Sequence, residues 1–368
     1  MVKQIRMTLH GSSGKLEQVN LWQVKSEPCL PAASAERKTP SREHGYKIPA
    51  WLSWILKRII SSLLGIIVIS MMVFAATQAL PSDPARVILG PEATDEAVAV
   101  FRQKLGLDQP ITAQYVQWIS RALQGDWGHS IDSNIPVTQL IAGRLANSLA
   151  LVVIVLLISI PSSLFLGVFL ALHRDGWIDR ICVSSMIALK AIPSFAIAIG
   201  LMMLLATSVF PILPAVSLLD PNRSAFAQPM FMILPALTLV FTVIPYLTRL
   251  LRSSMIEILD SEFITSARLR GLKRSTIIWQ YAIPNAAIPA IQAIALTTSV
   301  MIGGVLIVEV VFTYPGIGSA LNAAVDIRDI PVIQAIVVFL ASSVMLINLI
   351  ADIATVLLTP RLRTQPAS

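Results

Sequence analysis

Four polar side chains interrupt long apolar stretches of this sequence: Lys190, Glu309, Asn348 and Asp352. A charge inside a membrane segment costs about 2.5–3.5 kcal/mol on insertion scales, so such groups usually face a partner, a water-filled cavity or a ligand. Lys190 could attract a carboxylate in a cavity, or its long stem could carry the ammonium to an interface. Asn348 and Asp352 lie one helical turn apart, which favours hydrogen bonding between helices near one membrane face.

The sequence lacks the patterns of an enzyme. No G-x-x-x-x-G-K-[ST] motif occurs, so the chain by itself has no loop that could hold the phosphates of ATP. The four His residues are scattered over loops and the N-terminal segment, and no Ser-His-acid set falls at one depth, which argues against an intramembrane protease. Cys29 and Cys182 lack metal-like spacing, so we expect no zinc site, no disulfide and no cofactor.

The composition indicates an integral membrane protein. The 368 residues are 55% hydrophobic and 13% charged, with a mean hydropathy of +0.72, whereas an average soluble domain has roughly 25% charged residues. The formal net charge of +7 comes mostly from Lys and Arg at the ends of apolar stretches. This pattern sets membrane orientation, so we expect these charges to face a lipid bilayer and not nucleic acid.

Six apolar stretches are long enough to cross a bilayer core, which needs about 20 residues. The first lies within residues 50–80, and it exceeds the apolar part of a secretory signal, the rival interpretation. The other predicted spans are residues 145–172, 181–213, 229–248, 288–311 and 332–358. The expected fold class is therefore all-α with six transmembrane helices, and both termini lie on one side.

Polar segments lie outside these spans. Residues 81–144 have helical periodicity with breaks at Gly106, Pro110 and Gly125, which predicts a small extracytoplasmic helical domain between spans 1 and 2. Residues 1–49 have no sustained period, which predicts a disordered cytoplasmic extension. That extension is either an accessory tail or the product of an upstream start codon. Residues 364–368 form a short tail.

Basic residues are unevenly shared between the loops, which predicts the orientation. The outer loops after spans 3 and 5 carry Arg223 and Arg328. The loops on the other side carry Arg174, Arg180, Arg249, Arg252, Arg268, Arg270, Lys273 and Arg274. Under the positive-inside rule, the loop between spans 4 and 5 and both termini are cytoplasmic.

Residues 253–283 form a polar, basic segment between spans 4 and 5. Ser261 can cap a short helix there, Glu262 suits its first turn, Arg268 and Arg270 suit its last turn, and Gly271 ends it.

An apolar face of that helix is formed by Phe263, Ile264 and Ala267, and a second helix starts near Ser275. Two short helices with a glycine elbow suit docking into a partner's groove. The alternative is a solvated basic loop that only follows the charge asymmetry.

This segment resembles the cytoplasmic loop of ABC importer permeases. The general pattern is E-A-A, three residues, Gly, nine residues and I-x-L-P, and its spacing is kept from Thr265 to Pro284. Thr265, Ser266 and Tyr281 depart from that pattern. The variant of the dipeptide/oligopeptide branch is matched at Glu262, Phe263, Ser266, Ala267, Arg268, Arg270, Gly271 and Leu272.

Other segments resemble the same branch. They include residues 79–84, 105–108 and 125–128. At the outer end of span 5, the branch's fingerprint is matched by Glu309, Phe312, Pro315, Gly316 and Gly318. Glu309 could be a structural cap of this turn or a gate residue that meets the solute.

The resemblance covers about residues 51–363 and implies a permease subunit of a binding-protein-dependent ABC importer in the bacterial inner membrane. Its five-span core would be residues 145–363. Implied partners are a second homologous permease, two cytoplasmic ABC ATPases and an extracytoplasmic solute-binding protein. Peptides are the expected solutes, with nickel and glutathione left open because importers of both share this branch.

The resemblance also implies roles for named residues. Those for ATPase coupling are Glu262, Phe263, Ala267, Arg268, Arg270 and Gly271. Those for a pathway or gate are Lys190, Glu309, Phe312, Pro315, Gly316 and Gly318. A secondary transporter or channel is the alternative class; it predicts paired intramembrane charges or an inverted repeat, and the sequence has neither. A membrane scaffold is a third class.

Overall fold

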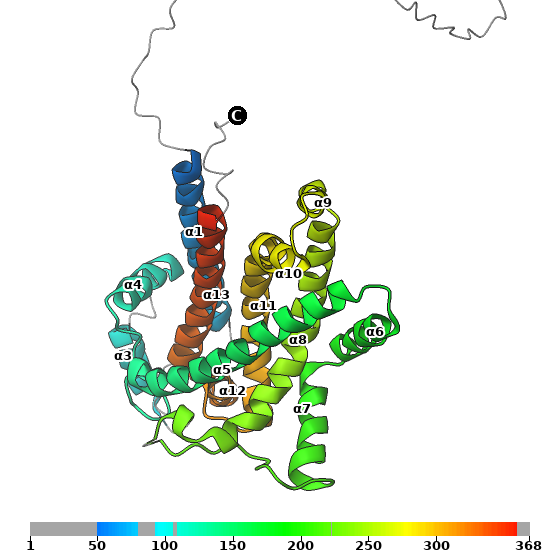
Figure 1. Cartoon of the computed structure of the whole chain (residues 1–368). Helices are drawn as coiled ribbons and strands as arrows, with labels where there is room; N and C mark the ends of the chain where they lie inside the picture. Colours follow the sequence, from blue (N-terminus) through cyan, green and yellow to red (C-terminus); the bar gives the residue numbers. More distant parts are fainter. Residues whose placement is uncertain (1–49, 80–92, 106–108, 222, 359–368) are drawn as a thin grey trace, which may run out of the picture. The chain divides into compact units, whose positions relative to one another are not determined.

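The computed structural model describes residues 50–79, 93–105, 109–221 and 223–358. The predicted N-terminal extension, residues 1–49, and the C-terminal tail, residues 364–368, lie outside these ranges. Within them the regular structure is helical, apart from one isolated bridge between His129 and Pro136 (Figure 1). The all-α fold class is therefore confirmed.

Five helices of the described part are long and apolar enough to cross a membrane. They are α1 (Ala50–Gln78), α5 (Val137–Leu172), α8 (Pro229–Leu259), α11 (Ile283–Val311) and α13 (Ile330–Leu358). They correspond to predicted spans 1, 2, 4, 5 and 6. The largest boundary differences are at three helices. Helix α5 begins at Val137 and not at 145, α8 continues to Leu259 beyond its predicted end at 248, and α11 begins at Ile283 and not at 288.

The predicted third span, residues 181–213, is not one continuous helix. Helix α6 (Trp177–Ala191) and helix α7 (Ser194–Met202), with its π-helical continuation Met203–Thr207, meet at a bend of 99°. Pro193 explains the break, since the residue before a proline avoids the helical conformation, and Ile192 has φ −82° and ψ 127°. The described part reaches six spans if this bent pair counts as one.

Two helices of the predicted extracytoplasmic segment are described, α3 (Asp95–Leu105) and α4 (Ile111–Leu123). Helix α4 packs on α1, where the ring centroid of Phe74 lies 5.6 Å from those of both Tyr115 and Trp118. The hydroxyls of Ser70 and Tyr115 are 2.7 Å apart. The segment is therefore anchored on the first membrane helix through aromatic side chains.

The membrane helices pack in a chain of neighbours: α5 against α8, α8 against α11, α11 against α13, and α13 beside α1 (Figure 1). The largest buried cluster joins α5, α7, α8 and α11, and includes Leu151, Leu239 and Met301. A β-carbon at Gly167 of α5 would lie 2.8 Å from Cβ of Leu251 in α8. A small residue at that point allows the close approach of the two helices.

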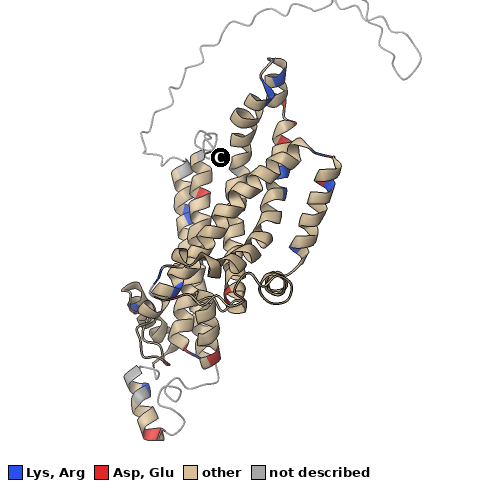
Figure 2. Ribbon diagram, turned by 60° about the horizontal axis from the view of Figure 1, so that its bottom comes forward, with Lys and Arg blue, Asp and Glu red and all other residues tan. Residues whose placement is uncertain are grey.

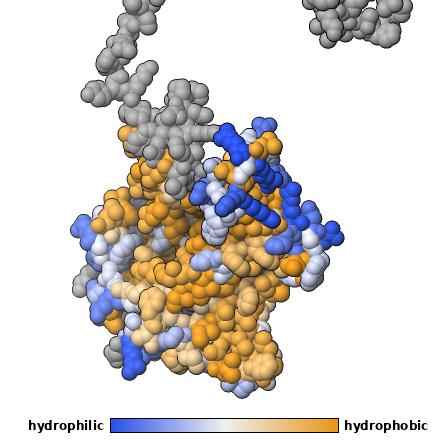
Figure 3. Space-filling view, viewed as in Figure 1, coloured by the Kyte–Doolittle hydropathy of each residue, from blue (hydrophilic) through white to orange (hydrophobic). Residues whose placement is uncertain are grey.

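Short elements lie at the ends of these helices. At one end are α9 (Glu262–Leu269), α10 (Arg274–Thr276) and the π-helix η3 (Ile277–Ala282). Two more short elements are η2 (Ala225–Ala227), just before α8, and α12 (Ile317–Ile327), between α11 and α13. Lys and Arg residues lie on the α9 tip (Figure 2), and a broad hydrophobic surface adjoins the hydrophilic α9 end (Figure 3). The position of α9 matches the predicted basic loop between spans 4 and 5.

Candidate coupling surface and translocation groove

The elbow after α9 is built as a Schellman turn. Gly271 has φ +75°, its N–H donates to the Arg268 carbonyl at 3.0 Å, and the Leu272 N–H donates to the Ala267 carbonyl at 3.3 Å. These two bonds satisfy carbonyls that a helix end otherwise leaves free. The predicted helix stop at Gly271 is therefore present, with a left-handed conformation that suits glycine.

The inner face of α9 is packed within this chain. Ile264 is fully buried, Ala267 is 5% exposed, and both pack with Ile277 of η3 and with Ile258 of α8. Ala267 therefore holds the elbow together from inside, and its expected role in ATPase coupling stays a prediction. The helix phase explains its burial, because Ala267 lies three residues after Ile264, on the same face.

The outer face of α9 is available to a partner. Phe263 is 45% exposed and Leu269 is 84% exposed. Glu262, Arg268 and Arg270 are exposed around them, although Arg268 also donates to the Leu259 carbonyl at 3.3 Å. We define the coupling surface as these five residues.

Ser261 precedes α9 but makes no side-chain cap; its hydroxyl donates backwards to the Ile258 carbonyl at 2.5 Å. The predicted capping bond is therefore wrong.

Two ion pairs connect the last part of α8 to the loop after α5 and to α6. Arg174 pairs with Asp260 at 2.5 Å on the surface, and this carboxylate raises the pKa of the Arg174 guanidinium above its ordinary value. Arg252 of α8 donates to both carboxylate oxygens of Asp179 in α6, each at 2.6 Å. A hollow of about 470 Å³ beside α9 is lined by Arg174, Asp260, Arg268, Arg274 and apolar neighbours.

Two further cavities are bordered by one face of α8 and one face of α11. We call these two cavities together the groove. The α8 residues are Leu239, Thr242, Val243, Tyr246 and Leu250, at spacings of three and four. Six of the α11 residues follow the same rule, from Pro289 through Gln292, Leu296, Val300 and Gly304 to Ile307, and Ala293, Ala295, Thr297 and Met301 line the cavities beside them. Residues at this spacing share one helix face, so both cavities follow the same pair of faces.

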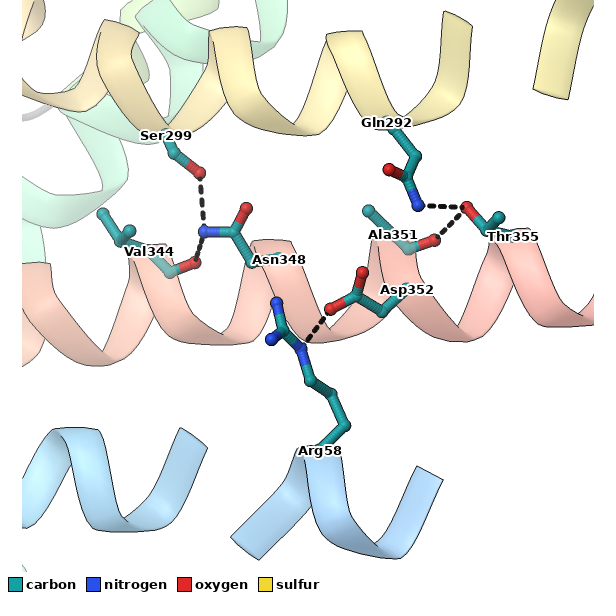
Figure 4. A network of polar contacts seen from close by, with 8 residues as sticks. All are labelled: Arg58, Gln292, Ser299, Val344, Asn348, Ala351, Asp352 and Thr355. Carbon is teal, nitrogen blue, oxygen red and sulfur yellow. Dashed lines mark hydrogen bonds and ion pairs between the residues drawn. The ribbon is translucent and has the colours of Figure 1, made fainter. Parts of the chain in front are cut away.

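The cavity near the start of α1 has a volume of about 570 Å³ and a polar wall. Arg58 of α1 pairs with Asp352 of α13 there (Figure 4). Asn348 donates to Ser299 of α11 at 3.1 Å, and Gln292 of α11 donates to Thr355 at 3.3 Å (Figure 4). The predicted role of Asn348 and Asp352 in bonding between helices is confirmed.

The second cavity, of about 310 Å³, is lined by Lys190, Ser194, Thr242, Thr297 and apolar residues of α6, α7, α8 and α11. Lys190 lies in the last turn of α6, just before the break at Pro193. Lys190 thus borders a cavity and is exposed, and its role as a pathway residue stays a prediction.

The fingerprint after α11 forms a buried turn. Glu309 is fully buried; its carboxylate accepts a bond from the Ser148 hydroxyl at 2.5 Å and one from the Gly318 N–H at 2.6 Å. Phe312 is also fully buried, and the Pro315 carbonyl accepts a bond from the Asn147 amide at 2.9 Å. The residues that line the groove do not include these five fingerprint residues, Glu309, Phe312, Pro315, Gly316 and Gly318.

Several residues of this arrangement were not found by sequence reasoning. Ser148 and Asn147 of α5 hold the Glu309 turn from more than 150 residues away in sequence, and no local pattern marks them. The polar positions Thr242, Tyr246 and Gln292 could have been found, because each recurs at helical spacing with the other groove residues. The Asp179–Arg252 pair joins two helices that are separate in sequence.

Comparisons with known proteins agree with this architecture. Residues 163–364 match the family described as binding-protein-dependent transport system inner membrane component. Residues 51–152 match the N-terminal part of such membrane components.

Two curated relatives are similar over nearly their whole length. A probable peptide ABC transporter permease of Sinorhizobium fredii is 33% identical over 84% of this chain and 99% of its own. The glutathione transport system permease GsiC of Escherichia coli K12 is 33% identical over 85% of this chain and 99% of its own. The chain is thus a multi-pass inner membrane protein, and it belongs to the family of inner membrane components of binding-protein-dependent transport systems.

Proposed function

We propose that this chain is one permease subunit of an ABC importer and forms half of the pathway by which peptides, with glutathione as a close alternative, enter the cell. The family supports transport that depends on a solute-binding protein. The functions of its two relatives, peptide and glutathione transport, support the solute class. ATP hydrolysis belongs to separate subunits, since this sequence has no phosphate-binding loop.

The complete importer would contain a second homologous permease, two ATPases and an extracytoplasmic solute-binding protein. The α9 end would face the cytoplasm, because Arg and Lys residues gather there and the positive-inside rule places such loops inside. Helix α1 begins, and helix α13 ends, toward the same end of the helix bundle as α9 in Figure 1, so both termini would be cytoplasmic as well.

The observation that carries this proposal is the continuity between the coupling surface and the groove. The buried Ile264–Ala267–Ile277 contact fixes α9 to η3, and η3 runs without interruption into α11. Helix α11 in turn supplies one wall of the groove. A displacement of α9 by an ATPase would therefore be passed to the groove wall through packed helices.

The test replaces the exposed aromatic ring of the coupling surface. Phe263→Asp should reduce copurification of the ATPase and ATP-dependent uptake, because a carboxylate replaces an apolar anchor in the partner's groove. Phe263→Leu is the matched control, since it keeps an apolar side chain at the same site. Normal ATPase binding and uptake by Phe263→Asp, at normal membrane levels, would contradict the docking role.

A second measurement separates the importer from a secondary transporter. Uptake into proteoliposomes, with the solute-binding protein outside and ATP enclosed on the α9 side, should require that ATP and should persist when the proton and sodium gradients are collapsed. Uptake that follows an ion gradient and ignores ATP would overturn the proposal.

A further inference from the structure

The two cavities of the groove differ in how their charges are balanced. Near the start of α1, the positive charge of Arg58 is matched by the Asp352 carboxylate within the same wall. In the other cavity, Lys190 is the one ionisable side chain among the residues that line it. No described residue forms an ion pair with Lys190. This cavity therefore has an uncompensated positive charge.

The position of Lys190 makes its positive charge costly in free energy unless water or an anion compensates for it. Lys190 is near the middle of the bent pair Trp177–Thr207, beside the break at Pro193. A cation at the centre of a membrane segment costs about 2.5–3.5 kcal/mol unless water or a partner compensates. Helix α7 starts on the same wall at Ser194, and the partial charge of a helix start has the same sign as the lysine. The local field therefore favours an anion.

Besides Lys190 and the Ser194 hydroxyl, the polar groups of the cavity are the hydroxyls of Thr242 and Thr297, which can act as hydrogen-bond acceptors. The Thr242 hydroxyl donates to the Thr238 carbonyl at 2.9 Å, and the Thr297 hydroxyl donates to the Ala293 carbonyl at 2.7 Å. Their protons are therefore engaged within their own helices, and their oxygens can accept from a ligand. A cation beside two acceptors suits a solute that has both a carboxylate and N–H groups.

We propose that the Lys190 ammonium binds a carboxylate of the solute, such as the free C-terminus of a short peptide, as the solute passes along the groove. This assignment rests on the proposed importer function and adds the ligand chemistry of one site. The volume of about 310 Å³ lies at the lower end of the range of about 300–1,000 Å³ for small-molecule sites. The cavity thus has room for a short peptide end, and its charge selects the carboxyl end.

The experiment uses the complete importer in proteoliposomes with its solute-binding protein. The probes are labelled dialanine, dialaninamide and glutathione. For each, uptake efficiency is the uptake rate divided by the half-saturating concentration, normalised to assembled permease. The variants are Lys190→Met, Lys190→Arg and, as a control outside the groove, Lys57→Met. Because one solute-binding protein serves every arm, its own preference cancels between variants.

Lys190→Met should lower the uptake efficiency for dialanine and glutathione by about tenfold or more, because a charge-assisted hydrogen bond is lost. The ratio of efficiencies for dialanine and dialaninamide should fall by a similar factor. Lys190→Arg should retain most of both quantities, and Lys57→Met should match the wild type.

Three results would overturn the assignment: unchanged efficiency in Lys190→Met, equal losses in Lys190→Met and Lys190→Arg, or failure of Lys190→Met to assemble. The last would show that Lys190 pairs with an acid of a partner subunit. If the wild-type complex imports none of the three probes, the peptide proposal itself fails and the assignment fails with it.

Discussion

Arg252 donates hydrogen bonds to both carboxylate oxygens of Asp179 at 2.6 Å, although the two residues are 73 positions apart. Asp179 is 3% exposed and lies in the first turn of α6, whereas Arg252 lies in the last part of α8, before α9 begins. The pair therefore connects α6, whose last turn contains Lys190, with α8, which leads to the coupling surface.

Asp179→Ala should destabilise the permease. Removing Asp179 leaves the charge of Arg252 without its partner, but the Arg252 side chain is 22% exposed, so the cost should fall below the about 3–5 kcal/mol of a fully buried pair. The midpoint of thermal unfolding in detergent should fall, and the double variant Asp179→Ala with Arg252→Met should recover part of the loss. Asp260→Ala is the matched control, because its partner Arg174 is on the surface. Equal losses for Asp179→Ala and Asp260→Ala would contradict this ranking.

Gly271 should tolerate substitution only as far as the left-handed conformation permits. Its φ is +75°, and a left-handed conformation costs an L-residue roughly 1–2 kcal/mol, with Asn among the least disfavoured. We expect Gly271→Val to reduce ATPase copurification and uptake much more than Gly271→Asn, while membrane insertion stays normal. Gly271→Asp should lie between the two. If Val and Asn have equal effects, the backbone conformation at the elbow does not control docking.

The long helices and the coupling segment could be predicted from sequence because their signals are local. Uncharged stretches, the residues around Gly271 and the lone Lys190 all stand out within a short window. The broken third span was missed because hydropathy is continuous across Pro193, so the apolar pattern outweighed the local preference of Ile192 for an extended conformation. A rule for X-Pro pairs would not by itself have found this break, because Pro161, Pro235, Pro245 and Pro289 all lie inside continuous helices.

Other features could not be predicted because they depend on contacts between distant segments. Phe263, Ile264 and Ala267 all looked like one apolar face, and only the packing of Ile277 decides which of them is buried. The partners of Glu309 are likewise on α5, far away in sequence. A single sequence has no signal for such pairs.

The turn after α11 should be intolerant of a side chain at Gly318. A β-carbon there would lie 2.5 Å from Cα of Leu306 and 2.9 Å from a carboxylate oxygen of Glu309. Because the first contact is with backbone, Gly318→Ala should cost about 1–3 kcal/mol through overpacking and should lower the unfolding midpoint. Gly303→Ala in α11 is the control, since nothing lies within 4 Å of its added carbon. A normal midpoint for Gly318→Ala would mean that the turn is looser than described.

The contribution of the Arg58–Asp352 pair to assembly and stability should require opposite charges on α1 and α13, whichever of the two helices has the positive one. Arg58 has a side chain 45% exposed and Asp352 one 17% exposed, so solvent or a neighbouring subunit screens the pair and a small effect on stability is expected. Asp352→Arg would place two like charges between α1 and α13, and should lower the amount of assembled permease and the unfolding midpoint.

The swapped variant, Arg58→Asp with Asp352→Arg, should restore both quantities, because the attraction between α1 and α13 returns with its sign pattern reversed. Asn348→Ala is a useful comparison, since it removes the neighbouring bond to Ser299 without changing the charge. Assembly is measured by copurification of the second permease, and stability by thermal unfolding of the purified complex. If the swapped variant is as poor as Asp352→Arg alone, then Arg58 has a partner beyond α13, and the cavity beside it is closed by another subunit.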